Sequence, residues 1–188
     1  AGTMRMSTVQ TVKTYMTAGV GGGSMVFIAS SGVISNNTAT VAFTAFDASA
    51  FDHYIFMMQN VKPKTDNVIL LCQTSTDGGS NFATTDGNYR EQSNNATGFI
   101  LSDQAGNAAT EYGISGSFQL YAPHATNFTY AQSLSMTMNL TGEVVNNAGL
   151  AKCAGVRLSA ADVDAVRFIF QSGNFEAGEI VMYGIANA

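Results

Sequence analysis

Short runs of alternating or continuous apolar residues recur about every 10 to 15 residues from Ser24 onward, and turn residues close each run. This rhythm is typical of short antiparallel strands and predicts an all-β protein, a jelly-roll-like antiparallel β-sandwich that spans residues 24–188. The predicted strands are 25–30, 38–46, 53–61, 67–74, 88–92, 98–101, 116–122, 133–140, 155–158, 165–171 and 179–185. One helical turn is expected at 159–164, where Ser159 can cap the first turn.

The middles of the longest apolar runs predict the core, because inward positions of a sandwich are filled by large apolar side chains. On this basis the expected core residues are Phe43, Ile55, Phe56, Leu70, Phe118, Phe168, Phe170 and Ile180.

The stretch Ser75–Phe82, S-T-D-G-G-S-N-F, directly follows an apolar run and resembles the Asp-box of sialidase-type propellers. That box is a folding device, in which an Asp side chain bonds nearby backbone groups and a Gly takes a positive φ. It occurs once here, in a chain too short for a propeller. The stretch therefore predicts a β-hairpin turn in which Asp77 orients Gly78 and Gly79.

Residues 1–23 differ from the rest and are expected to form an extended N-terminal arm that ends in a Gly-rich hinge. The segment has Arg5 and Lys13 but no acidic residue. It is either a disordered tail or a segment that orders against a neighbouring subunit, because it is more apolar than a freely solvated tail should be. The candidate partner-binding residues are Met4, Arg5, Met6, Lys13, Tyr15 and Met16.

Composition narrows the possible partners. Of the 188 residues, 46% are hydrophobic and only 11% are charged, so the polar surface consists largely of Ser, Thr, Asn, Gln and Gly. Such a surface is common in proteins that pack against other subunits. The net charge of -5 and the lack of a basic cluster argue against nucleic acid as a partner. No apolar run is long enough for a membrane helix and no signal peptide is recognisable, so we expect no membrane partner and synthesis in the cytoplasm.

The chain offers little catalytic chemistry, and we expect it not to be an enzyme. His53 beside Asp52 resembles half of a triad but has no nucleophile motif, and it is expected to bond a turn at a strand edge. His124 is expected to be exposed. The aspartate pairs Asp47/Asp52, Asp77/Asp86 and Asp162/Asp164 are interpreted as turn residues, without the oxygen-rich spacing of a calcium loop. No cofactor or metal site is predicted.

The cysteines and tyrosines leave alternatives open. Cys72 and Cys153 permit one disulfide, but two buried reduced thiols are favoured. Tyr54, Tyr89, Tyr112 and Tyr121 could stack on sugar rings, although packing in the core or in an interface is favoured.

Three pieces together carry a resemblance: F-D-H-Y-I-F-M-M-Q-N-V-K-P at 51–63, the 75–82 stretch followed by Tyr89, and V-R-F-I-F-Q-S-G-N-F-E-A-G-E-I-V-M-Y-G-I at 166–185. As a set they resemble tailed-bacteriophage virion proteins of the head-fibre, tail-fibre and capsid decoration types. The resemblance implies a jelly-roll body and a place in the virion, assembled in the host bacterial cytoplasm.

The function expected from this resemblance is that of a capsid decoration or cement protein. It would form a homotrimer and clamp neighbouring subunits of the major capsid protein. The alternative is a receptor-binding tail-fibre or head-fibre domain that binds host surface glycan.

Overall fold

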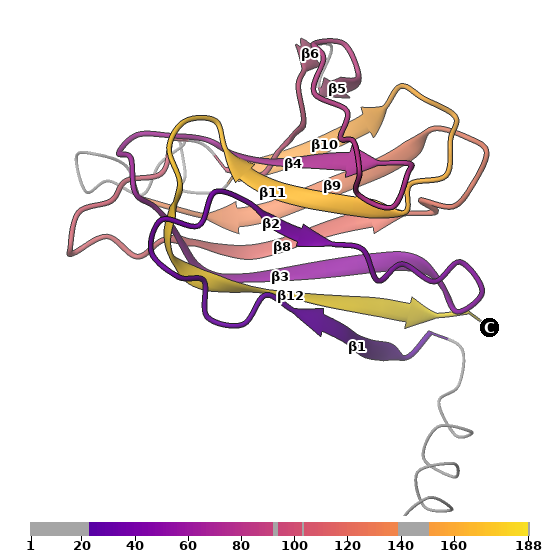
Figure 1. Ribbon diagram of the computed structural model, residues 1–188, viewed down its shortest axis with the longest axis horizontal. Helices are drawn as coiled ribbons and strands as arrows, with labels where there is room; N and C mark the ends of the chain where they lie inside the picture. Colours follow the sequence, from indigo (N-terminus) through magenta and orange to yellow (C-terminus); the bar gives the residue numbers. More distant parts are fainter. Residues whose placement is uncertain (1–22, 92–93, 103, 139–150, 188) are drawn as a thin grey trace, which may run out of the picture.

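The computed structural model describes residues 23–91, 94–102, 104–138 and 151–187. Within them the chain forms two antiparallel sheets packed as a sandwich, with the small sheet in front of the large one in Figure 1, and no helix. The strands are β1 (Met25–Ser30), β2 (Val41–Phe43), β3 (Phe51–Pro63), β4 (Leu70–Ser75), β5 (Tyr89–Glu91), β6 (Asn94–Ala96), β7 (Phe99–Ile100), β8 (Ile114–Tyr121), β9 (Thr129–Met136), β10 (Ala151–Arg157), β11 (Ala165–Phe170) and β12 (Phe175–Ala186). The predicted all-β class and two-sheet sandwich are confirmed.

The strand order is β1-β12-β3-β8-β9-β10-β5-β6 in the large sheet and β2-β11-β4-β7 in the small one. Four of the ladders are nested in sequence, because β4 pairs with β7, β3 with β8, β2 with β11 and β1 with β12. Strands β9 and β10 and the hairpin β5–β6 extend the large sheet beyond β8. The large sheet is therefore twice as wide as the small one.

Aromatic rings hold the two sheets together. Phe168 of the small sheet packs with ring centroids 5.3 Å from Phe56 and 6.2 Å from Phe118 of the large sheet. Phe43, also of the small sheet, lies 5.5 Å from Phe56. Edge-to-face contacts of this kind add to the free energy gained by burying the rings themselves.

Seven of the eight predicted core residues are buried, namely Phe43, Phe56, Leu70, Phe118, Phe168, Phe170 and Ile180. The prediction for Ile55 is wrong. Side chains alternate along a strand, and in β3 Tyr54 and Phe56 point inward, so Ile55 lies on the opposite face and is only half-buried.

The predicted helical turn at 159–164 is also wrong, because these residues bond other loops instead of one another. The Val163 N–H donates to the Pro123 carbonyl at 2.8 Å and the Asp164 N–H donates to the Ser75 carbonyl at 3.1 Å. The side chain of Val163 is fully buried. Tertiary hydrogen bonds and burial outweigh the capping signal of Ser159.

The Asp77 turn does not close a hairpin, contrary to the prediction. Strand β4 before it pairs with β11 and β7 in the small sheet, whereas β5 after it pairs with β10 and β6 in the large sheet. The loop is therefore a connection between the two sheets. Strand β6, which the apolar pattern does not predict, forms the hairpin with β5.

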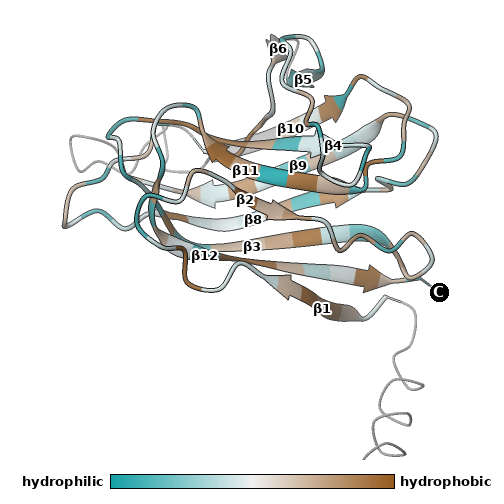
Figure 2. Cartoon of the chain, in the orientation of Figure 1, coloured by the Kyte–Doolittle hydropathy of each residue, from teal (hydrophilic) through white to brown (hydrophobic). Residues whose placement is uncertain are grey.

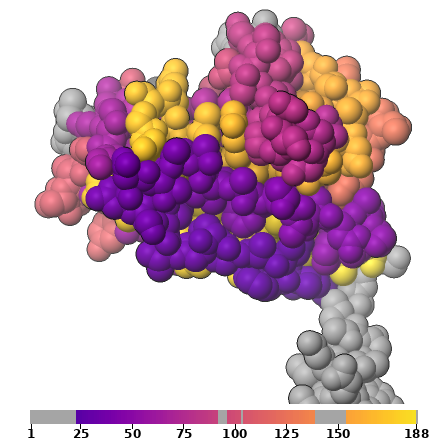
Figure 3. Space-filling view, in the orientation of Figure 1, coloured from indigo at the N-terminus to yellow at the C-terminus, as the bar shows by residue number. Residues whose placement is uncertain are grey.

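The segment between β1 and β2 seals one side of the sandwich. The N–H groups of Ser31, Ile34 and Asn37 donate to carbonyls of β12 at 2.8 to 2.9 Å. Ile34 is buried in the core. Figure 3 shows the early part of the chain, in indigo to purple, spread across the visible side of the molecule.

Asn60 and Gly178 interrupt the regular pairing between β3 and β12, which continues with a shifted register to Pro63 and Phe175. Asn60 has a φ of 50° and Gly178 a φ of 117°, and a Cβ on Gly178 would lie 2.6 Å from the Asn60 carbonyl oxygen. The register shifts here, between Ala177 and Glu179 on β12. Such a bulge re-aims the following side chains.

The aromatic contacts predict a large cost for Phe168→Ala. Removing a ring that contacts three others should lower the free energy of unfolding by about 3 to 5 kcal/mol. Ile55→Ala, on the opposite face of the large sheet, is the comparison and should cost clearly less. Urea unfolding followed by circular dichroism measures both, and equal losses would contradict the placement of the core.

Candidate interaction surface and the predicted site residues

The candidate partner-binding residues of the arm, Met4, Arg5, Met6, Lys13, Tyr15 and Met16, all lie outside the described residues. The described chain starts at Gly23, the last residue of the predicted hinge, which has a φ of 87°. Its N–H donates to the Ala186 carbonyl at 2.7 Å, and the Ala186 N–H donates to Ser24. The described chain thus begins at the edge of the large sheet, where β1 starts.

The Asp77 turn is held by a compact set of hydrogen bonds. The Asp77 carboxylate accepts bonds from the Ser75 hydroxyl at 2.7 Å, from the Asn81 N–H at 2.8 Å and from the Asn81 side-chain amide at 2.7 Å. Both Gly78 and Gly79 have a positive φ. The Gly79 N–H donates to the Ser75 hydroxyl oxygen at 3.0 Å, so Ser75 links the glycine to Asp77.

A second carboxylate ties this turn to the sandwich. The Gly78 N–H donates to Asp164 at 2.9 Å, and Asp164 belongs to the loop between β10 and β11. Nearby, the guanidinium of Arg167 lies 4.5 Å from the ring centre of Phe82. These contacts fasten the 76–88 connection to the small sheet, so the turn has a structural role in the described residues.

The hydrogen bonds from Asn81 and Ser75 lower the pKa of Asp77 to about 2. Because this pKa is lower in the folded state than the ordinary value of 3.8, the carboxylate stabilises the fold above about pH 4. That contribution is lost as the pH falls through about 2.

We therefore expect Asp77→Asn to lower the melting temperature near neutral pH, with the difference from the wild type narrowing between pH 4 and pH 2. Thermal melts across this range test the expectation. Asp86→Asn is the matched control, since Asp86 is an exposed turn aspartate of the same loop. An equal difference at pH 7 and pH 2 would show that the charge of Asp77 is not responsible.

His124 is not exposed, contrary to the prediction, since its side chain is only 12% accessible. Its Nε2 lies 2.9 Å from the Tyr54 hydroxyl and its Nδ1 lies 3.1 Å from Asp162. The same hydroxyl accepts a bond from the Asp47 N–H at 2.8 Å. Tyr54 is fully buried, and burial raises its pKa to about 12, so it presents no accessible nucleophile. The hydrogen bonds through Tyr54 and His124 join the three loops that contain Asp47, His124 and Asp162.

His53 was expected to bond a turn at a strand edge, and the structure places it elsewhere. It lies on β3, an inner strand of the large sheet, and its ring stacks on Tyr121 of β8 with centroids 4.4 Å apart. Burial lowers the pKa of His53, while a hydrogen bond with Gln119 partly opposes that shift. Its neighbour Asp52 is exposed.

The remaining candidates are scattered. Cys72 is a free, fully buried thiol, as predicted, and burial raises its pKa. The side chain of Cys153 lies outside the described residues.

Among the described residues, no three His, Cys, Asp or Glu side chains gather in a way that could hold a metal ion. The described part of the chain also contains no helix with the length and hydropathy needed to cross a membrane.

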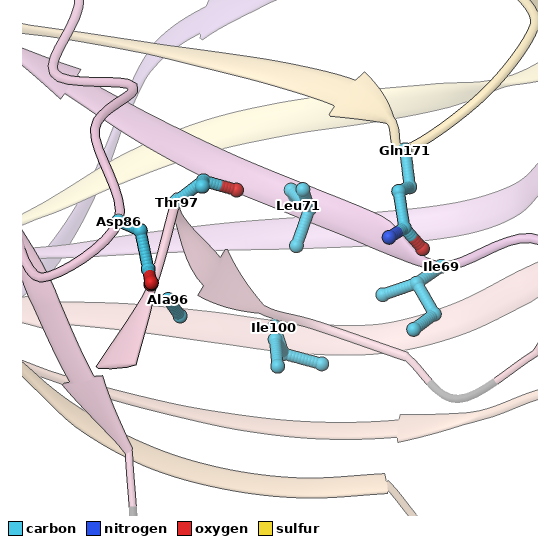
Figure 4. Close-up of a pocket in the computed structure, with 7 residues that line it drawn as sticks. All are labelled: Ile69, Leu71, Asp86, Ala96, Thr97, Ile100 and Gln171. Carbon is cyan, nitrogen blue, oxygen red and sulfur yellow. The ribbon is translucent and has the colours of Figure 1, made fainter. Parts of the chain in front are cut away.

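One small groove lies between the small sheet and the β5–β6 hairpin (Figure 4). It has a volume of about 230 Å³ and opens to solvent. Its lining is Ile69, Leu71, Asp86, Ala96, Thr97, Ile100 and Gln171. Aliphatic side chains dominate and Asp86 is the single charged group in the lining, so the groove presents no cluster of polar groups for a specific small ligand.

The solvent-facing side of the large sheet is unusually rich in apolar and aromatic side chains. The strand registers align outward side chains in three rows across β1, β12, β3, β8 and β9, which together we name the outer face. The rows are Met25, Ile185, His53, Tyr121 and Tyr130; Phe27, Tyr183, Ile55, Gln119 and Gln132; and Ser30, Val181, Met57, Ser117 and Leu134. Most members are apolar or aromatic, and none is Asp, Glu, Lys or Arg.

Several of these side chains are well exposed. Met25, Phe27, Met57, Tyr130 and Leu134 have between 44% and 60% of their surface accessible. Figure 2 shows β1, at the edge of the sheet, as a largely hydrophobic strand. Scattered exposed apolar residues are normal, but a contiguous patch marks an interaction surface.

Sequence reasoning missed the outer face, although one signal for it is present. In the β3 stretch Tyr54–Met58 every residue is apolar or aromatic, without the polar alternation of a strand that has one side in water. Because Ile55 is predicted as a core residue, the outward-facing apolar side of this strand is treated as a buried one.

Comparison of the chain with models of protein families, with curated proteins and with solved structures gives no match.

Proposed function

We propose that this chain is a structural virion protein of a tailed bacteriophage, and specifically a capsid decoration or cement protein. It assembles in the host cytoplasm as a homotrimer and binds and stabilises the lattice of the major capsid protein. The observation that carries the proposal is the outer face, an apolar surface whose three rows include no Asp, Glu, Lys or Arg. Such a surface is typical of proteins that act by packing against other subunits.

The strand order supports a jelly roll as the body of this protein. The nested ladders β4·β7, β3·β8, β2·β11 and β1·β12 are the pairings of one long antiparallel hairpin wound into two sheets. Double-sheet jelly rolls are frequent among viral capsid domains. In this proposal β9–β10 and β5–β6 are insertions that widen one sheet.

The arm supplies attachment to the capsid. Arg5 and Lys13, without a carboxylate in residues 1–23, are suited to an acidic patch on a capsid subunit. The methionines of the arm adapt to shallow apolar grooves. The hinge lets arm and body take different directions.

The rival function, a receptor-binding fibre domain that holds host glycan, gains less support. Of the four tyrosines that could stack on sugar, Tyr54 and Tyr89 are fully buried and Tyr121 stacks on His53. Tyr112, at 77% accessibility, is the one fully open to solvent. A platform for sugar rings needs several exposed aromatic faces close together, and these four tyrosines do not form one; the exposed rings of Phe27 and Tyr130 belong to the outer face.

Copy number in the virion separates the two functions. A decoration protein should be abundant, with a copy number of the same order as that of the major capsid protein, while a fibre protein should be present in only a few copies. Quantitative gel densitometry of purified virions measures the ratio. A low ratio, or loss of adsorption with intact head stability after deletion of the gene, would support the fibre function instead.

Deleting residues 1–23 tests the role of the arm. We expect the truncated chain to keep nearly the same melting temperature, because the aromatic rings that join the two sheets come from Phe43, Phe56, Phe118 and Phe168. Binding to heads that lack the protein should be abolished or sharply weakened. Arg5→Gln and Lys13→Gln should each weaken binding to heads. The effect of each substitution should be smaller at high salt, because salt screens charge attraction. A truncated chain that still decorates heads at full occupancy would contradict this role.

A further inference from the structure

We infer that the outer face is the surface on which copies of this chain pack against one another. The inference concerns contacts between copies, and it does not depend on what the assembled protein binds. It follows from the composition, the charge and the area of the outer face.

The composition favours burial. Phe27 packs edge-to-face against Tyr183 with centroids 6.0 Å apart, and both rings stay partly accessible. Met57 on β3 and Leu134 on β9 occupy the same row, two strands apart, with Ser117 of β8 between them. Aromatic residues and methionine are enriched in the centres of protein interfaces, where charged residues are depleted.

The charge of the chain points to a second copy as the occupant. Each copy carries a net charge of -5, so two copies repel one another unless their acidic groups stay away from the contact. No member of the three rows is acidic, and the carboxylate of Glu179, which precedes Val181 on the same side of β12, accepts a hydrogen bond from the Ser30 hydroxyl at 2.6 Å. Two outer faces can therefore meet along these rows with Glu179 at the margin of the contact.

The lack of acidic residues in the three rows also argues against the arm, residues 1–23, as the segment that covers the outer face. Arg5 and Lys13 would each need a carboxylate opposite, and none of the three rows contains one, while Glu179 lies at their margin on β12. Laying the arm there would desolvate two cations beside this one carboxylate.

The area is sufficient for a stable contact. Five strands about 4.8 Å apart and about five residues long, at roughly 3.3 Å per residue, give a footprint on the order of 400 Å² in projection. Side-chain relief raises the accessible area toward the roughly 600 Å² that each partner contributes at the lower end of specific interfaces. An apolar patch of a few hundred Å² on a protein surface is often an interaction site.

The test is the mass of the purified full chain, measured by size-exclusion chromatography with light scattering over a range of concentrations. We expect a dimer or trimer for the wild type. Phe27→Asp and Leu134→Asp, at opposite sides of the outer face, should each raise the dissociation constant at least tenfold or yield monomers. Val33→Asp is the matched control, because Val33 is an 85% exposed residue in the loop after β1.

Circular dichroism separates lost contact from lost folding, since both outer-face positions are at least half exposed and the monomers should keep the β spectrum. The milder Leu134→Gln should give an intermediate dissociation constant. Three results would overturn the inference: a monomeric wild type at all concentrations, an oligomer that survives both Asp variants, or dissociation caused only by deletion of residues 1–22. If the Asp variants dissociate as expected but the wild-type oligomer does not bind heads, only the proposed function is overturned.

Discussion

The fold depends on the packing of aromatic rings between the two sheets. Phe56 and Phe118 of the large sheet and Phe43 and Phe168 of the small sheet meet with centroids between 5.3 and 6.2 Å apart. These rings are all buried, and their contacts fix the distance and the alignment of the sheets. The nested ladders bring them together from β2, β3, β8 and β11, which are spread over residues 41 to 170.

The two sides of the large sheet are covered unequally. The small sheet covers the inner side of the large sheet, and the aromatic core fills the space between them. Nothing in the described residues plays that part on the outer side, where Phe27, Met57 and Leu134 stay exposed. A strand such as β3, apolar on both of its sides, is stable in water only when a second layer covers it. The protein therefore carries a surface suited to assembly, and we propose that copies of the chain cover it.

The loops at one end of the sandwich are joined by polar side chains. Asp164 accepts a bond from Gly78, and His124 bridges Tyr54 and Asp162. Each contact links segments that are 38 to 86 positions apart in the chain. These contacts form where local sequence signals predict a short helix at 159–164 and a hairpin at 75–82.

The sequence by itself determined the all-β class, the two-sheet sandwich and most of the core, because strand periodicity and large apolar side chains act locally and leave a clear pattern. It also marked the Asp77 stretch as a turn. Only the tertiary structure decided which side of β3 faces the core, so that Ile55 belongs to the outer face. It likewise decided that the Asp77 turn crosses between the sheets and that 159–164 forms no helical turn. These outcomes depend on hydrogen bonds and packing between residues distant in sequence, whose free energy exceeds that of any local preference.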